Sequence, residues 1–271
     1  MRRRARLDAE LVRRGLARSR DHAAELVAQR RVRVRGVTAT KPATGIDSDT
    51  PLLVQNTDNE PDWVSRGARK LLGALDGLIA GGPAVTGRRC LDAGASTGGF
   101  TDVLLHRGAR EVIAVDVGYG QLDWSLRTDP RVRVLDRTNV RALQPEDIGG
   151  TVDLIVADLS FISLRLTLPA LIGCTAPDGD LLLMVKPQFE VGRERVGAGG
   201  VVRDPLLRAQ AVLDVLAVAT VLGLGLVDAI ASPVPGPSGN VEYFLWLRRG
   251  PTDPLRPAED LVHAAVRKGP Q

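Results

Sequence analysis

The chain has 271 residues, of which 44% are hydrophobic, and a formal net charge of +4. This length fits one large domain, or a small domain joined to a medium one, with enough apolar residues for a substantial core. Cys90 and Cys174 are far apart and have no His cluster near them, so we expect both in the core and no disulfide or metal site. No apolar run approaches the about 20 residues of a membrane helix, and no secretory signal is visible. We therefore expect a cytoplasmic protein that does not act at a membrane.

The positive charge is concentrated at the start of the chain. Residues 1–54 contain 13 Lys and Arg against 6 Asp and Glu, whereas the remaining residues carry a slight acidic excess. This distribution is typical of a nucleic-acid-binding module. A basic tail that only improves solubility is the alternative, but the segment also has helical periodicity.

Residues 1–54 predict a small α/β unit of two helices and a strand. An apolar stripe indicates a helix over 7–15, and Ser19 is suited to cap a second helix that runs to about residue 29. The run from Val32 to Val37 then alternates apolar and basic residues, which is typical of a half-exposed strand.

The rest of the chain has a different pattern. Residues 55–63 are polar and turn-rich, so we interpret them as a linker. Residues 64–271 alternate short apolar runs with helical patterns, which predicts an α/β fold with a mostly parallel, seven-stranded sheet covered on both faces. Since only a short Pro- and Gly-rich loop joins the last two strands, we expect the final strand to be antiparallel. The expected strands lie at about 88–93, 111–116, 131–135, 153–158, 180–186, 226–232 and 241–249, and the helices near 98–107, 119–127, 163–173 and 203–222.

A Gly-rich turn over residues 92–100 follows the first of these strands. Its glycines allow a ligand to approach the backbone at a helix N-terminus, and Asp116, about twenty residues later, is placed to accept hydrogen bonds from a ribose. The spacing departs from the G-x-G-x-x-G of dinucleotide sites, and Asp92 would repel a pyrophosphate but attract an ammonium group. The turn therefore favours S-adenosylmethionine over a nicotinamide dinucleotide, with a purely structural turn as the third reading. The expected cofactor-binding residues are Asp92, Gly94, Ala95, Ser96, Thr97, Gly98, Gly99, Phe100, Asp116, Asp136 and Asp158.

Two lysines and two acids indicate the reaction. Asp158 and Lys186 each end a predicted buried strand, where open α/β sheets bind ligands. Methyltransferases of base amines carry an Asn/Asp-Pro-Pro-aromatic run where this chain has Asp158-Leu159-Ser160-Phe161. Methylation at pyrimidine carbon 5 needs a nucleophilic Cys, and neither cysteine is suitably placed. A ribose 2′-hydroxyl needs a base or an activating acceptor, which a lysine of lowered pKa can supply. We expect the catalytic residues to be Lys70, Asp158, Lys186 and Glu242.

These residues resemble the catalytic tetrad of the FtsJ-like ribose 2′-O-methyltransferases. The first 54 residues resemble the RNA-binding module named after ribosomal small-subunit protein four. Nearly the whole chain resembles the TlyA family of rRNA cytidine 2′-O-methyltransferases, whose members are often labelled haemolysins. The strings that carry this resemblance include Leu91 to Thr101, Asp116 to Leu122, Ala157 to Ser163, Lys186 to Glu190 and Gly236 to Glu242.

The resemblance implies a Rossmann-like class I methyltransferase fold with S-adenosyl-L-methionine as the cofactor. It also implies cytidines of small- and large-subunit rRNA as substrates, ribosomal subunits as partners, and an influence on susceptibility to ribosome-binding cyclic peptide antibiotics. The expected RNA-binding residues, suited to phosphate contacts rather than to sequence reading, are Arg6, Arg18, Arg20, Arg31, Arg33 and Arg35.

Two departures from the family pattern are visible. Arg35 stands where the module usually has Asn before Gly, and Pro61-Asp62 precedes Trp63 where relatives often have Arg-Ala. The second departure leaves open any role of that Arg in coupling the two domains.

Two other functions compete with methyl transfer. One is a cytolysin, which the missing secretion signal and membrane helix disfavour. The other is a non-catalytic RNA-binding assembly factor, which the intact four-residue set disfavours. The loops over 192–200 and 232–240 flank the proposed site, and we expect them either to close over RNA or to be plain flexible connections.

Overall fold

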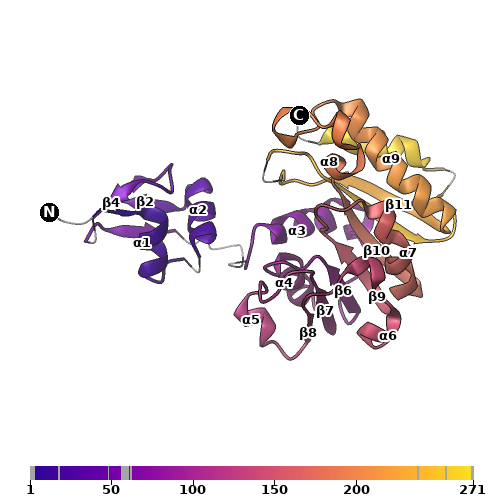
Figure 1. The fold of residues 1–271 in the computed structure, drawn as a ribbon, viewed down its shortest axis with the longest axis horizontal. Coiled ribbons are helices and arrows are strands. Elements are labelled where there is room, and N and C mark those ends of the chain that lie inside the picture. Colours follow the sequence, from indigo (N-terminus) through magenta and orange to yellow (C-terminus); the bar gives the residue numbers. More distant parts are fainter. Residues whose placement is uncertain are drawn as a thin grey trace. The chain divides into compact units, whose positions relative to one another are not determined.

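The computed structural model describes residues 4–17, 19–47, 49–55, 61, 63–236, 238–253 and 255–269. The chain divides into two compact units, residues 1–62 and 63–271, and each is described by itself (Figure 1). Arg18 and Pro237 lie outside the described residues.

The first unit packs two helices against short strands. Ser19 caps the second helix as expected, because its Oγ accepts a hydrogen bond from the backbone N–H of His22 at 3.1 Å. Apolar side chains of both helices and of β2 form the core of this unit. Its elements are β1 (Ala5–Arg6), α1 (Leu7–Arg13), α2 (Arg20–Ala28), β2 (Val32–Val34), β3 (Val37–Thr38), β4 (Gly45–Ile46) and β5 (Leu52–Val54).

The strand expected over 32–37 is instead a tight hairpin. Val34 of β2 pairs with Val37 of β3, and the two residues between them turn the chain. Arg35 has φ 51° and Gly36 has φ 81°. Two successive positive φ angles characterise a type I′ turn, which favours Asn-Gly because most other side chains are strained there. Arg35 therefore occupies a position for which its side chain is poorly suited.

Replacing Arg35 should reveal this strain. We expect Arg35→Asn to stabilise the hairpin by about 1 kcal/mol, because Asn tolerates a left-handed backbone. Slower amide hydrogen exchange in β2 and β3 would show the gain. Arg35→Ala, which removes the guanidinium without relieving the backbone, is the matched control. Equal exchange in Arg35→Asn and wild type would contradict the strain.

The second unit alternates strands and helices as expected. The helix predicted over 119–127 is the main difference, because only its last turn, Trp124–Arg127, is helical. Gly118 and Gly120 lie in the preceding loop, where the low helix propensity of glycine disfavours a longer helix. Its strands are β6 (Arg89–Ala93), β7 (Glu111–Val115), β8 (Val132–Leu135), β9 (Val152–Ala157), β10 (Thr175–Val185), β11 (Leu224–Ala231) and β12 (Tyr243–Arg249). Its helices are α3 (Gly67–Gly77), α4 (Gly99–His106), α5 (Trp124–Arg127), α6 (Pro145–Ile148), α7 (Leu164–Cys174), α8 (Pro187–Glu190), α9 (Pro205–Val221) and α10 (Ala258–Lys268), with short 3-10 turns at Ile79–Gly81, Val140–Ala142, Arg193–Arg195 and Ala198–Gly200.

Within the described residues, seven strands form one sheet in the order β11-β12-β10-β9-β6-β7-β8. Pairings from β10 through β8 are parallel, and β12 is antiparallel to both of its neighbours. The predicted α/β fold with an antiparallel last strand is confirmed.

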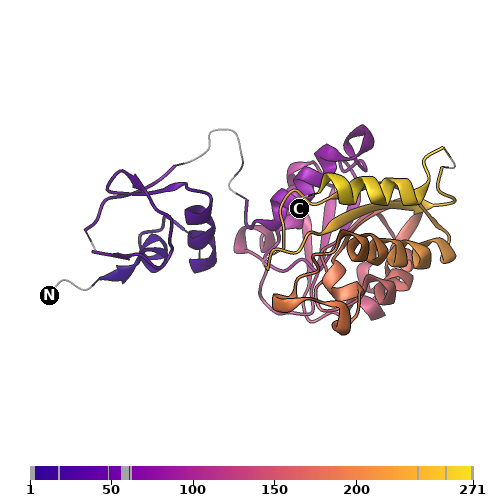
Figure 2. The ribbon, with the colours of Figure 1, turned by 90° about the horizontal axis from the view of Figure 1, so that it is seen from above.

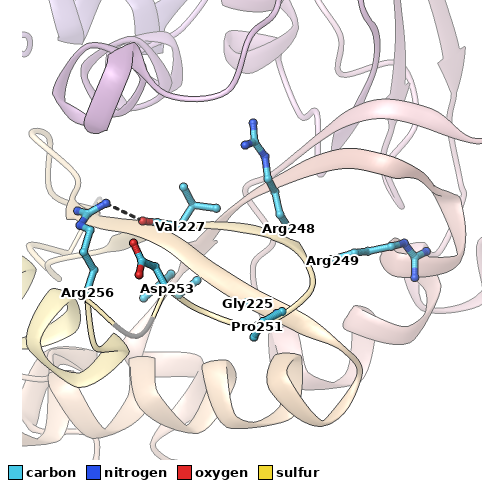
Figure 3. A pocket seen from close by; sticks show the side chains of 8 residues that line it. Gly225, Val227, Arg248, Arg249, Pro251, Asp253 and Arg256 are labelled. Carbon is cyan, nitrogen blue, oxygen red and sulfur yellow. Dashed lines mark hydrogen bonds between the residues drawn. The ribbon is translucent and has the colours of Figure 1, made fainter.

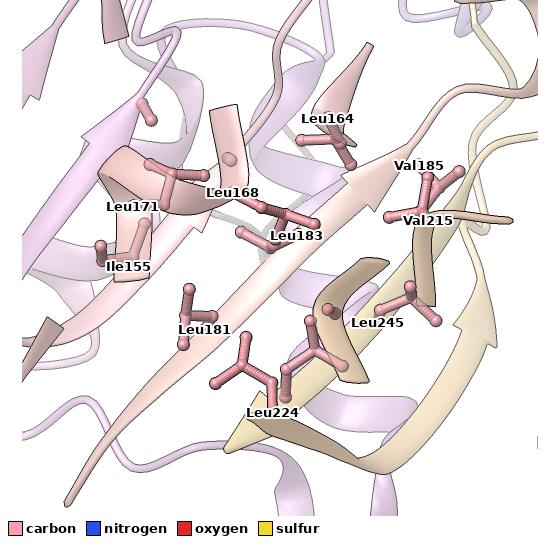
Figure 4. Packing of buried hydrophobic residues seen from close by; sticks show 14 of the residues in the cluster. Ile155, Leu164, Leu168, Leu171, Leu181, Leu183, Val185, Val215, Leu224 and Leu245 are labelled. Atoms are coloured by element: carbon pink, nitrogen blue, oxygen red, sulfur yellow. The ribbon is translucent and has the colours of Figure 1, made fainter. Parts of the chain in front are cut away.

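Helices cover both faces of this sheet (Figures 1 and 2). Alternate residues of β10 explain why both faces are apolar: Leu181, Leu183 and Val185 belong to one buried cluster, and Leu182 and Met184 to the other. Figure 4 shows the first cluster, in which these side chains meet leucines of α7 and Val215 of α9. Cys90 and Cys174 are buried free thiols, as expected. In the described part of the chain, no helix is long and apolar enough to cross a membrane.

Candidate active site

The four predicted catalytic residues reach one edge of the sheet through the strand directions. Asp158 directly follows β9 and Lys186 directly follows β10, which are parallel neighbours. Glu242 directly precedes β12, and because β12 is antiparallel, its start lies where β9 and β10 end. Val185 pairs with Tyr243, so the same register places Lys186 opposite Glu242.

Lys186 forms the more accessible of the two ion pairs at this edge. Its Nζ lies 2.5 Å from Oδ1 of Asp158, and it donates a hydrogen bond to Oγ of Ser160 at 2.7 Å. The side chains of Lys186 and Asp158 are 8% and 20% exposed. An ammonium group has three donors, so these two partners leave one N–H of Lys186 for a further acceptor.

Lys70 forms a second ion pair that is deeply buried. Its Nζ donates to Oε2 of Glu242 at 2.5 Å, and the two side chains are 5% and 1% exposed. The other oxygen of Glu242, Oε1, is buried without a hydrogen-bond partner. A Cβ at Gly236 would lie only 2.7 Å from this oxygen, so the loop backbone closes tightly over the carboxylate.

The Gly-rich turn touches this edge through its backbone. Gly94 has φ 88°, and a Cβ there would lie 2.8 Å from the carbonyl oxygen of Asp158. Asp158 N–H donates to the carbonyl of Ala93 at 3.0 Å. Only glycine fits at residue 94 without displacing Asp158, which explains the residue type in physical terms.

The other turn residues take different positions. The side chains of Ala95 and Phe100 belong to a buried cluster, so only the backbone of these residues can face a ligand. Gly98 has φ 100° and caps α4, which begins at Gly99. The backbone N–H of Ser96 donates to Oδ2 of Asp116 at 2.8 Å. Thr97 accepts a backbone hydrogen bond from Asp123 at 3.2 Å.

Asp116 and Asp136 follow β7 and β8 and hold the loops beside the turn. Oδ1 of Asp116 accepts from Gly118 N–H at 2.7 Å. Oδ2 of Asp136 accepts from Arg127 at 2.7 Å, and this hydrogen bond lowers the pKa of Asp136. With Asp92 on β6 and Asp158 after β9, four carboxylates lie at the ends of neighbouring strands.

Asp92 lies beneath the turn, fully buried, and it fixes the start of α4. Its Oδ2 accepts from Thr101 N–H at 2.9 Å and from Thr101 Oγ1 at 2.7 Å, whereas its Oδ1 has no hydrogen-bond partner. Burial raises the pKa of Asp92 to about 7, and the nearby charges of Asp158 and Asp116 add to the increase. The sequence predicted that Asp92 attracts an ammonium group. In the structure, the buried Oδ1 is the Asp92 oxygen left for such a contact.

The raised pKa of Asp92 predicts a pH-dependent stability. An acid whose folded-state pKa is raised contributes stability below its unfolded pKa, and this contribution is lost as the pH rises through about 7. We expect the thermal midpoint of the wild type to fall relative to that of Asp92→Asn between about pH 4 and about pH 7, and the difference to stay constant above about pH 7. Parallel midpoint curves between about pH 4 and about pH 7 would show that the pKa of Asp92 is not raised in the folded protein.

Comparison with known proteins agrees with this geometry. A model of the FtsJ-like methyltransferase family matches residues 63–249, and a model of the S4 domain matches residues 5–50. The chain belongs to the FtsJ-like methyltransferase family.

Full-length relatives are also similar to this chain. It is 63% identical to the protein named 16S/23S rRNA (cytidine-2'-O)-methyltransferase TlyA of Mycobacterium tuberculosis, over 100% of both chains. It is 41% identical to the putative rRNA methyltransferase YqxC of Bacillus subtilis, over 95% of this chain and 91% of that protein. The solved structure of a putative hemolysin from Streptococcus thermophilus has a TM-score of 0.75 at 36% identity, and the match covers 99% of this chain and 97% of that one.

Three polar residues at this edge of the FtsJ-like domain were not predicted as site residues. Ser160 contacts Lys186 directly, and its only sequence signal was its place two residues after Asp158. Glu190 is buried and accepts from Ser163 Oγ at 2.5 Å and from Leu164 N–H at 2.7 Å, which ties the loop after β9 to α8. Asn240 is buried and joins the two flanking loops through Val202 N–H and the carbonyl of Gly200, at 2.9 and 2.8 Å.

A depression of about 610 Å³ is lined by residues that follow Asp158 and Lys186 closely in the sequence. Its lining includes Phe161 and Phe189, whose rings lie 5.3 Å apart, and the Gly-rich residues 192–200 supply part of its rim. Phe161, three residues after Asp158 in the sequence, is 91% exposed, so its ring is open to solvent.

A smaller pocket of about 260 Å³ lies at the opposite edge of the sheet (Figure 3). Arg248 and Arg249 end β12 there, and their side chains point away from one another. Arg256 donates to the carbonyl of Val227 at 3.0 Å. Because these charges do not converge, this pocket offers no comparable site.

The predicted RNA-binding arginines lie in the S4 unit, with Arg18 outside the described residues. Arg6 and Arg20 both contact Asp8. Arg31 donates to the carbonyl of Gln55 at 3.0 Å, and Arg33 is exposed on β2. Arg35 lies 3.6 Å from Asp47 with its side chain 66% exposed.

Proposed function

We propose that this protein transfers a methyl group from S-adenosyl-L-methionine to the ribose 2′-hydroxyl of a cytidine in rRNA. The observation that carries the proposal is the pair of lysine–carboxylate contacts, Lys186–Asp158 and Lys70–Glu242, at the edge that the Gly-rich turn also reaches. The names of the similar proteins from Mycobacterium tuberculosis and Bacillus subtilis, one a cytidine-2'-O-methyltransferase and the other a putative rRNA methyltransferase, support it.

The residues around the turn suit S-adenosylmethionine because this cofactor is cationic at its sulfonium and ammonium groups. Carboxylates end four neighbouring strands, and the buried Oδ1 atom of Asp92 lacks a hydrogen-bond donor. A dinucleotide pyrophosphate would be repelled by these acids. Asp92, Asp116, Asp136 and Asp158, with the backbone of residues 94–99, would hold the cofactor, which supplies an electrophilic methyl group when bound.

Lys186 is the residue best placed to act on the acceptor hydroxyl. Its ammonium is oriented by Asp158 and Ser160, and its third N–H is available for the 2′-oxygen. A donor at that oxygen positions it and stabilises the charge that develops as its proton departs. Asp158, at 20% exposure, is the acid that this proton can reach. Most of the remaining acceleration comes from alignment of the reacting atoms.

Lys70 and Glu242 support this arrangement from within the protein. Both are almost fully buried, so each requires the charge of the other. The β10–β12 register places Glu242 opposite Lys186, so the two ion pairs start from neighbouring backbone positions.

The depression lined by Phe161 and Phe189 suits the base of the target nucleotide, since bases stack on exposed aromatic rings. The arginines of the S4 unit would contact phosphates of folded rRNA. We further propose cytidines of both ribosomal subunits as targets, action in the cytoplasm, and an influence on susceptibility to ribosome-targeting cyclic peptide antibiotics.

The alternative functions lack such support. A cytolysin is suggested by the names of similar proteins, such as Hemolysin A of Brachyspira hyodysenteriae and the putative hemolysin from Streptococcus thermophilus, and by no feature of the site. A non-catalytic assembly factor would not need a lysine held by a carboxylate and a hydroxyl at this edge of the sheet.

Radiolabelled methyl transfer to ribosomal subunits that lack the modification tests the proposal. We expect activity in the wild type and a loss of about 100-fold or more in Lys186→Ala, because removing one donor to a developing oxyanion costs about 10²–10³-fold. Lys186 is preferable to Lys70, since removing one partner of a buried pair costs about 3–5 kcal/mol of stability. Lys268→Ala, an exposed lysine of α10, is the control. Near-normal transfer by Lys186→Ala would remove Lys186 from the mechanism, and no transfer by the wild type would favour the assembly factor.

A further inference from the structure

Helix α1 of the S4 unit carries two buried acids, and each holds a pair of arginines. Asp8 is 4% exposed and Glu10 is 2% exposed. Glu10 pairs with Arg13 and Arg14, which lie on or directly after the same helix. Asp8 instead joins side chains from two different elements.

Both partners of Asp8 belong to the predicted RNA-binding set. Arg6 of β1 donates from Nη2 to Oδ2 of Asp8 at 2.7 Å and from Nε to Oδ1 at 3.0 Å. Arg20, the first residue of α2, donates from Nη2 to the same Oδ2 at 3.2 Å. The hydrogen bond from Arg6, followed by that from Arg20, holds the pKa of Asp8 well below its usual range. Asp8 is therefore charged at neutral pH.

The guanidinium groups remain accessible on their outer side. The side chains of Arg6 and Arg20 are 51% and 58% exposed. Together with Asp8 and the turn at Pro42-Ala43, they line an open depression of about 520 Å³, to which Asp21 also contributes. The Asp8 N–H donates to the carbonyl of Pro42 at 2.9 Å, so the turn, the helix and both arginines are fixed to one another.

We propose that Asp8 is a positioning residue that orients Arg6 and Arg20 for neighbouring phosphates of rRNA. This inference rests on the proposed function, in which the S4 unit binds rRNA. A free arginine loses rotamer freedom when it binds a phosphate, whereas a guanidinium already held by a carboxylate loses less. Because Arg6 uses Nε and Nη2 on Asp8, its Nη1 is the nitrogen that an oxyanion would contact.

If Asp8 orients the two arginines, the effect of Asp8→Asn on RNA affinity should be opposite to the effect expected from the change in net charge. Asp8→Asn removes a negative charge, which by long-range electrostatics alone would tighten RNA binding. Loss of orientation instead weakens binding. Glu10→Gln makes the same charge change on the same helix, at a similarly buried acid that does not contact Arg6 or Arg20, and is therefore the matched control.

The test measures binding of the full-length protein to ribosomal subunits that lack the modification, at one fixed salt concentration. We expect Asp8→Asn to weaken binding by about tenfold, in line with the ordering of two long side chains. Glu10→Gln should bind within about twofold of the wild type or more tightly. Arg6→Ala and Arg20→Ala, at half-exposed side chains, should each weaken binding.

The outcomes separate this inference from the proposed function. Unchanged or tighter binding by Asp8→Asn, with weaker binding by both Arg→Ala variants, would overturn the role of Asp8 alone. Unchanged binding by both Arg→Ala variants would overturn the proposed RNA surface itself.

Hydrogen exchange over residues 7–13 checks that Asp8→Asn keeps α1 folded. We expect it to stay folded, because the Asn side-chain oxygen can still accept the 2.7 Å hydrogen bond that Ala9 N–H donates to Asp8. If α1 does unfold, Arg20→Lys decides the question, because it keeps the charge but not the planar guanidinium. Binding by Arg20→Lys as weak as that of Arg20→Ala would support the proposal, and wild-type binding would overturn it.

Discussion

The arrangement of the candidate site depends on charge neutralisation at one edge of the sheet. Lys70 and Glu242 are almost fully buried and 2.5 Å apart, and Lys186 and Asp158 form a second, more accessible pair. A buried ammonium or carboxylate is costly unless it is paired, and removal of one partner costs about 3–5 kcal/mol. Each lysine therefore requires its acid, and the loops that carry these residues are constrained to meet.

The antiparallel last strand makes this meeting possible. If β12 ran parallel to β10, its first residues would lie at the opposite edge, and Glu242 could not reach Lys70. Because it is antiparallel, the loop before β12 and the loops after β9 and β10 converge, and Gly94 brings the Gly-rich turn against Asp158. The S4 unit uses the same principle on a smaller scale, since Asp8 holds Arg6 and Arg20 together. In both units a carboxylate contacts the cations for which we propose a function.

The sequence could predict whatever depends on local pattern. The apolar run that ends at Val185 indicated a strand buried on both faces, so Lys186 was placed correctly at its end. The hairpin at Arg35 was missed because its backbone conformation usually calls for Asn, which this chain lacks. The side chain of Asp92 on β6 contacts Thr101, and Ser160 in the loop after β9 contacts Lys186. The packing around each side chain sets its direction, which residue type alone does not determine. The shared contact of Arg6 and Arg20 with Asp8 likewise arises from packing between separate elements.

We propose that this edge of the FtsJ-like domain acts on a ribose hydroxyl. The decisive experiment incubates unmodified ribosomal subunits with the protein and S-adenosylmethionine, digests the rRNA to nucleosides and analyses them by mass spectrometry. We expect new 2′-O-methylcytidine, with the added methyl group on the sugar fragment. A methyl group on the base fragment, or no new methylated nucleoside at all, would contradict it.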